Sequence, residues 1–229
     1  MTTTTQPAEV TTAVQAWLTR FGGALAAGDA EAAAALFTED CFWRDLVAFT
    51  WNIRTFEGRG AVATMLADTL ARVRPTGWKI TDGEEPAEAG GVTEAWIEFE
   101  TAVGRGRGHL RLRDGQAWTL LTTLYELKGH EEPRGPNRPM GAQHGASRDR
   151  TSWLEDRQRE AAELGFTEQP YVLIVGGGQA GIGLAARLRQ LDVPAIVIDK
   201  RGRPGDQWRS RYKSLCLHDP VWYDHMPYL

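Results

Sequence analysis

The chain has 229 residues, enough for about two domains, and its hydrophobic and charged fractions, 42% and 24%, are ordinary for a globular protein. The net charge of −4 and the lack of a strongly basic block argue against a nucleic-acid partner or an anionic membrane surface. Cys41 and Cys216 are isolated, which fits a reducing cytoplasm and provides no metal-site spacing. No apolar run is long enough to span a bilayer, and residues 1–9 have the composition of a disordered tail. We therefore expect a cytoplasmic protein.

The N-terminal part of the chain begins with helical patterns. Apolar residues recur at intervals of three and four over residues 10–27, which predicts an amphipathic helix. A Gly-Asp break follows, and Asp29 can cap a second helix over residues 30–37. A third helix is predicted over residues 61–73.

Alternating patterns follow and predict strands. Apolar and polar residues alternate over residues 92–101 and 108–113, and Asp114-Gly115 is a hairpin signal before a long strand over residues 116–127. Helices followed by an antiparallel meander predict an α+β domain. One face of the last strand is expected to carry Trp118, Leu120, Thr122 and Leu124.

A set of residues between Trp17 and Gly60 carries a resemblance to a known family. These residues are Trp17, Phe21, Ala24, Leu25, Gly28, Asp29, Ala33, Leu36, Phe37, Asp40, Trp43, Arg44, Asp45, Gly58 and Gly60. With them, residues 10–128 resemble the NTF2-like, SnoaL-like α+β cone domains. The resemblance implies a bent sheet around a helix, with a cavity that binds a ligand, catalyses a reaction or serves only in dimerisation. A homodimer through this domain is one expectation.

Three polar residues of this domain are candidates for such a cavity, and four tryptophans are candidates for its walls. An aromatic-lined hollow with a few polar groups is a common small-molecule site. The stronger alternative is structural: tryptophans at strand spacing fill a core, the arginine and aspartate form an ion pair, and the histidine is satisfied or solvated. The polar candidates are Arg44, Asp45 and His109, and the wall candidates are Trp43, Trp51, Trp96 and Trp118.

Residues 129–152 are rich in proline, glycine and charge without periodicity, and are interpreted as a linker. Thr151 or Ser152 can cap a short helix over residues 153–164, and Glu155 lies three residues after Ser152 in a capping-box arrangement.

The most informative stretch is a strand–glycine–helix–strand pattern that begins at Tyr171. The apolar run 171–175 predicts a buried parallel strand, and Gly176, Gly178 and Gly181 then form a G-x-G-x-x-G motif at the start of a helical pattern. A second apolar run ends in Asp199, 23 residues after Gly176. This context predicts a βαβ dinucleotide-binding unit, the alternative being a glycine-rich turn in an ordinary α/β protein.

Each residue of this motif has a physical task. Gly176 permits the tight turn, Gly178 lets a pyrophosphate approach the backbone, and Gly181 lets helix and strand pack closely. The helix N-terminus attracts phosphates, and Asp199 can accept hydrogen bonds from ribose hydroxyls. The basic stretch that follows suits a ligand with two phosphates, or is a solvated loop. Its cations are Arg201, Arg203, Arg209, Arg211 and Lys213.

Further matches extend over residues 153–229: the glycine motif, Asp199-Lys200, the run 205–209, the run 211–218 and Met226-Pro227. With them the segment resembles the flavin-containing monooxygenases, in particular the plant indole-pyruvate (YUCCA-type) branch. The resemblance implies FAD as the cofactor, NADPH as its reductant and a small organic substrate. It assigns cofactor binding to Gly176, Gly177, Gly178, Gln179, Ala180, Gly181, Asp199, Lys200, Gln207, Trp208, His218 and Asp219, and identifies no catalytic residue.

The family's second glycine motif and its Phe-x-Gly-x-x-x-His signature do not occur in the chain. We therefore expect an α+β NTF2-like cone domain followed by the start of an α/β Rossmann-type FAD-binding domain, as the N-terminal portion of a longer monooxygenase whose NADPH site lies further on. The alternative is a non-enzymatic dimerisation or ligand-binding module with a vestigial tail. An NAD-dependent dehydrogenase is disfavoured by the run 205–208 and by Leu217-His218, which such enzymes have no reason to carry.

Overall fold

The computed structural model describes residues 7–138, 151–216, 220 and 222–223. The chain forms two compact units that divide between Glu131 and Glu132, and each is described by itself. The predictions for residues 1–6 of the tail, for 139–150 of the linker, and for His218 and Asp219 lie outside the described residues.

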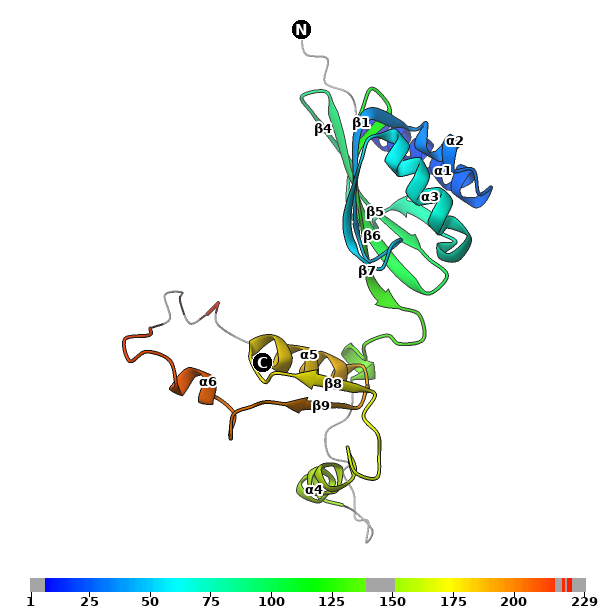
Figure 1. Cartoon of the computed structure of the whole chain (residues 1–229). Helices are drawn as coiled ribbons and strands as arrows, with labels where there is room; N and C mark the ends of the chain where they lie inside the picture. Colours follow the sequence, from blue (N-terminus) through cyan, green and yellow to red (C-terminus); the bar gives the residue numbers. More distant parts are fainter. Residues whose placement is uncertain (1–6, 139–150, 217–219, 221, 224–229) are drawn as a thin grey trace. The chain divides into compact units, whose positions relative to one another are not determined.

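The N-terminal unit is a bent sheet with helices on one face (Figure 1). Its sheet has seven strands in the order β2-β1-β7-β6-β5-β3, with β4 paired to β5, and only β1 and β7 run parallel. This is the α+β cone arrangement that the sequence predicted. The elements are α1 (Pro7–Ala26), α2 (Ala30–Ala34), β1 (Phe37–Leu46), β2 (Ile53–Glu57), α3 (Arg59–Val73), β3 (Thr76–Ile80), β4 (Ala87–Ala89), β5 (Val92–Glu100), β6 (Gly104–Arg113) and β7 (Gln116–Leu127).

The three predicted helices are present, with shifted ends. The first begins at Pro7 inside the predicted tail, and the second ends at Ala34 because Phe37 already belongs to β1. As expected, the Asp29 carboxylate caps the second helix by accepting a hydrogen bond from the Ala32 N–H at 2.9 Å. Four strands, β1 to β4, were not predicted; in β1 an irregularity between Phe37 and Phe42 interrupts the alternation on which strand prediction depends.

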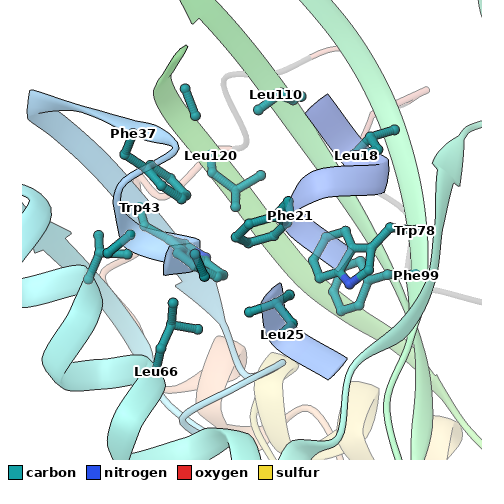
Figure 2. Packing of buried hydrophobic residues seen from close by; sticks show 14 of the residues in the cluster. Leu18, Phe21, Leu25, Phe37, Trp43, Leu66, Trp78, Phe99, Leu110 and Leu120 are labelled. Carbon is teal, nitrogen blue, oxygen red and sulfur yellow. The ribbon is translucent and has the colours of Figure 1, made fainter. Parts of the chain in front are cut away.

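Aromatic rings from both layers fill the interior of this unit (Figure 2). Trp17 stacks on Phe21 with ring centroids 4.6 Å apart, and Trp78 stacks on Phe99 at 4.5 Å. The Phe99 ring lies directly on the backbone of β6, where a Cβ on Gly106 would come within 2.2 Å of the ring. Burial of each such side chain contributes about 1.5–3 kcal/mol, so these rings are a large part of the stability of the unit.

The two cysteines differ in their surroundings, and this gives a simple test of the fold. Cys41 is buried in the core, where burial raises the pKa of its thiol, whereas Cys216 is exposed. Because the thiolate is the reactive form, we expect one thiol of the native chain to react quickly with a disulfide reagent and the second only after denaturation. Mass mapping should place the fast label on Cys216; rapid labelling of Cys41 would contradict the described core.

The C-terminal unit contains the predicted βαβ pattern. Strands β8 (Val172–Val175) and β9 (Ala195–Ile198) are parallel and are connected through α5 (Gln179–Gln190). Helix α4 (Trp153–Glu163) precedes them and has the predicted capping box, in which the Ser152 hydroxyl accepts from the Glu155 N–H and the Glu155 carboxylate accepts from the Ser152 N–H. The unit also has a short 3-10 helix (Gly135–Asn137) and α6 (Asp206–Arg209).

One face of the β8–β9 sheet carries exposed aliphatic side chains. Ile174 faces α5 and is 7% exposed, whereas Leu173 and Val175 on the other face are 57% and 79% exposed. The prediction of a buried strand is therefore wrong for this face, because among the described residues no second layer covers Leu173 and Val175.

Candidate dinucleotide-binding site

The glycine loop between β8 and α5 has the backbone that the motif predicts. Gly176 has a φ of +109°, a value that residues with a side chain rarely adopt. Its N–H donates to the Ile198 carbonyl oxygen at 2.7 Å. A Cβ on Gly181 would lie 1.9 Å from the Gly176 carbonyl oxygen, so the helix approaches the loop as closely as glycine permits. Gly178 is different, because a Cβ there would meet only the Gln207 side-chain oxygen at 3.4 Å. Gly176 and Gly181 therefore form the turn, whereas the absence of a side chain on Gly178 leaves open space beside the loop.

Helix α5 begins at this loop with an N-terminus suited to an anion. Gly178 occupies the N-cap position and has no side chain to cap the first N–H groups, and the first turn contains no acidic residue. Unsatisfied N–H groups and the helix dipole give this end a partial positive charge. Gln179 and Ala180, which begin the helix, are exposed.

Asp199 ties the end of β9 to the glycine loop. One carboxylate oxygen accepts the Gly177 N–H at 2.7 Å, and the other accepts the Arg201 N–H at 2.8 Å. These two backbone hydrogen bonds hold the pKa of Asp199 below its ordinary value, so the group is a carboxylate at neutral pH. Each oxygen keeps a lone pair for a ribose hydroxyl.

Two adjoining cavities meet at the glycine loop. The larger has a volume of about 840 Å³, the smaller about 420 Å³, and Gly177, Ile182, Gly205 and Gln207 line both. The larger also contacts Gly178, Gln179, Trp208, Arg211, Tyr212 and Lys213, and the smaller contacts Asp199, Arg201 and Val197.

The structure thus gathers part of the predicted set around these cavities. Gly177, Gly178, Gln179, Asp199, Gln207 and Trp208 line at least one of them, whereas Lys200 is exposed and lines neither. Sequence reasoning did not single out Ile182, Tyr212 or Tyr223, which also line the larger cavity. Tyr212 lies within the run 211–218 that carries the family resemblance, whereas for Tyr223 the only signal in the sequence was its aromatic character near the basic stretch.

The polar candidates of the N-terminal unit do not form a site together. Arg44 and Asp45 point to opposite sides of β1, so the expected ion pair is wrong: Arg44 donates to the Thr55 hydroxyl at 2.8 Å. His109 stacks on Trp96 with ring centroids 4.6 Å apart and lies 3.7 Å from Glu94. Burial lowers the pKa of His109, with Glu94 acting in the opposite direction. Neighbouring residues Gly108 and Leu110 are the buried ones on β6, so His109 faces away from the interior.

Asp45 is fully buried and surrounded by hydrogen-bond donors. Its carboxylate closes the loop between β1 and β2 and reaches across to β7, which is a structural role. The indole N–H of Trp43 extends the same network by donating to the Thr122 hydroxyl at 2.8 Å. The donors to Asp45 are the N–H groups of Ala48, Phe49 and Thr50 and the hydroxyls of Thr50 and Thr122, at 2.8–3.2 Å.

Two other expected wall residues also lie outside the interior. Trp51 is 55% exposed in the loop after β1. Trp118 was expected beside Leu120, but a register irregularity opposite Leu112 turns it to the other face. There the Arg113 guanidinium lies 3.2 Å from the centroid of the Trp118 ring. Of the four tryptophans, only Trp43 is part of the core.

Comparison with known proteins supports the assignment of the second unit. Residues 174–227 match the family described as the NAD(P)-binding Rossmann-like domain. This segment is similar to dinucleotide-binding domains. An uncharacterized CzcO-like oxidoreductase of Geobacillus kaustophilus is 39% identical over 56 residues, which is 24% of this chain and 16% of that protein. The indole-3-pyruvate monooxygenase YUCCA8 of Oryza sativa is 38% identical over 58 residues, which is 25% of this chain and 14% of that protein. The chain therefore spans about one sixth of the length of these relatives.

Solved structures resemble the first unit at low identity. A protein of unknown function from Mycobacterium tuberculosis aligns with a TM-score of 0.40 and 20% identity over 52% of this chain and 73% of its own. An NTF2-like protein of unknown function from Cytophaga hutchinsonii aligns with a TM-score of 0.33 and 13% identity over 55% of this chain and 95% of its own. None of the described helices is both long and apolar enough to cross a membrane.

Proposed function

We propose that the C-terminal unit binds FAD, and that the chain contributes this site to an NADPH-using flavin monooxygenase acting on a small organic molecule. The observation that carries the proposal is the glycine loop at the N-terminus of α5, which opens onto two adjoining cavities. A dinucleotide has two nucleoside ends joined by a pyrophosphate, and this arrangement offers one cavity to each end and the N–H groups to the phosphates.

The residues present fit such a ligand. Asp199 borders the smaller cavity as a carboxylate, which suits ribose hydroxyls and disfavours a phosphate on that ribose. Trp208 and Tyr212 border the larger cavity and provide flat surfaces for a ring system. A bound flavin supplies electron transfer and oxygen chemistry, and the chain's own residues bind the cofactor and orient it. The preference for FAD over a nicotinamide dinucleotide draws support from the similarity to YUCCA8, whose name describes a monooxygenase.

Cofactor retention tests the proposal. The purified chain is incubated with FAD, desalted, and examined by visible absorption, with NADH and NADPH titrated in parallel by calorimetry. We expect a retained flavin spectrum and weaker binding of both nicotinamides. Binding of NADH without FAD would reassign the site to a nicotinamide cofactor, and binding of none of the three would refute a dinucleotide site.

A second candidate is a non-enzymatic pairing module formed by the N-terminal unit. We propose a homodimer through the outward face of its sheet, because Trp96 and Tyr125 are 49% and 44% exposed there. Beside them, Glu94 and Glu98 on β5 pair with Arg111 and Arg107 on β6 within one chain, so the charges that border this aromatic surface are balanced and do not repel a second copy. Analytical ultracentrifugation should show a dimer that Trp96→Glu dissociates; a monomeric chain would exclude this candidate.

A further inference from the structure

The basic stretch after Asp199 divides into cations that are already paired and cations that are not. Asp206 accepts from Arg203 Nε at 2.7 Å and from Arg209 Nη1 at 3.1 Å. Arg201 donates to the Asp206 carbonyl oxygen at 2.8 Å and to the Ser210 hydroxyl. These contacts fold the stretch onto itself around α6. Three of its cations are therefore committed to partners inside the loop.

Arg211 and Lys213 differ from these three. Among the described residues, neither has a carboxylate partner. Both line the larger cavity, which Arg209 also lines while it is paired with Asp206. The Arg211 guanidinium lies 5.7 Å from the centroid of the Trp208 ring. An aromatic face positions a guanidinium without neutralising its charge. Within the described part of the chain, the cavity therefore contains two cations with no local counter-ion.

The same cavity is bordered by the glycine loop and the first turn of α5. An anion in it would meet the free N–H groups of that turn together with the two uncompensated cations, and Asp206 is already occupied. Charge-assisted hydrogen bonds to phosphate are stronger than neutral ones, and Arg and Lys are the side chains that make them.

We propose that Arg211 and Lys213 bind the pyrophosphate of the dinucleotide, whereas Arg201, Arg203 and Arg209 hold the loop in shape. This inference rests on the proposed function, because it names the residues of that same site that recognise phosphate. Lys213 contributes a point charge, and Arg211 is held in place by Trp208.

The test compares ligands that differ only in phosphate. Adenosine and ADP are titrated by calorimetry into the full chain and into Arg211→Gln and Lys213→Gln, and FAD serves as the complete ligand. We expect each substitution to weaken the binding of ADP and of FAD about tenfold, which corresponds to about 1.4 kcal/mol, and to leave the affinity for adenosine unchanged. The dependence of ADP affinity on salt should also become shallower, because fewer charges meet the phosphates.

Two variants serve as controls for net charge. Arg189→Gln removes one charge from an exposed position of α5 that pairs with Glu160 and lines neither cavity. Arg203→Gln removes one from the loop, beside the smaller cavity, and should lower the thermal stability of the unit. It should weaken ADP and adenosine binding alike, so that the ADP-to-adenosine affinity ratio stays nearly unchanged. Circular dichroism melts confirm that each variant is folded.

The results distinguish a wrong assignment of Arg211 and Lys213 from a wrong assignment of the dinucleotide site itself. If the wild-type chain binds FAD and ADP but Arg211→Gln and Lys213→Gln behave like Arg189→Gln, the assignment of the two cations is wrong and the dinucleotide site stands. If Arg203→Gln lowers the ADP-to-adenosine ratio as strongly as they do, the division of the loop is wrong. If the wild-type chain binds none of the ligands, the proposed function itself fails.

Discussion

Gly178→Ala is expected to abolish retention of FAD while leaving the fold intact. The backbone at this position, with φ −77° and ψ −174°, is one that alanine adopts readily. The added methyl would meet only the end of the flexible Gln207 side chain at 3.4 Å. It would, however, occupy the space through which a phosphate reaches the N–H groups of α5. We expect FAD affinity to fall about 100-fold, which is about 2.7 kcal/mol, with no change in the circular dichroism melt.

Gly181→Ala, in contrast, is expected to disturb the fold of the C-terminal unit. Its methyl would lie 1.9 Å from the Gly176 carbonyl oxygen and 3.3 Å from Ile174 Cγ2, so the helix must move away from the loop. Overpacking of this kind costs about 1–3 kcal/mol or more. Hydrogen exchange over residues 172–198 should rise in Gly181→Ala and stay unchanged in Gly178→Ala. Unchanged FAD retention in Gly178→Ala would show that the phosphates of FAD do not bind at this loop.

Asp45→Asn is expected to destabilise the N-terminal unit by about 2–4 kcal/mol, although the two side chains have nearly the same shape. The hydrogen-bond partners of Asp45 described above are all donors, from the N–H of Phe49 at 3.1 Å to the hydroxyl of Thr122 at 2.9 Å. An amide N–H₂ placed among donors leaves buried groups without acceptors and crowds hydrogen atoms together. Urea denaturation followed by tryptophan fluorescence measures the loss.

Asp40→Asn is the matched control for this prediction. Asp40 lies on the same strand, its side chain is 72% exposed, and it is 3.9 Å from Arg113. An exposed pair at that distance contributes little, so the substitution should change the free energy of unfolding by less than about 0.5 kcal/mol. Equal, small effects of the two substitutions would show that Asp45 does not hold the β1–β2 loop as described.

The βαβ pattern of the C-terminal unit was predictable because its signals are local. The positive φ of Gly176 and the close contact at Gly181 are properties of a few consecutive residues, so spacing alone indicates them. The partners of the arginines were not predictable, since composition gives a charge but not the carboxylate that neutralises it. Asp206 was not singled out by the sequence, although it binds both Arg203 and Arg209.

In the N-terminal unit, some features depend on contacts between distant residues and could not be predicted from local sequence patterns. The predicted helices and the strands β5 to β7 follow from periodicity, which survives as long as each strand keeps its register. A single irregularity beside Trp118 turned that side chain outward, and no feature of the sequence marks it. Asp45 is bonded to Thr122, which lies 77 residues later, so its structural role depends on a pairing of distant strands.

The exposed aliphatic side chains of β8 have a consequence for the life of this chain in a cell. Leu173 and Val175 belong to a four-residue run of valine, leucine and isoleucine, the kind of segment that holdase chaperones and quality-control proteases select. A covering polypeptide would shield this run, and a bound ligand would make unfolding of the unit rarer, so either should lengthen the half-life of the chain. Abundance measured in cells grown with or without riboflavin would then report on cofactor supply.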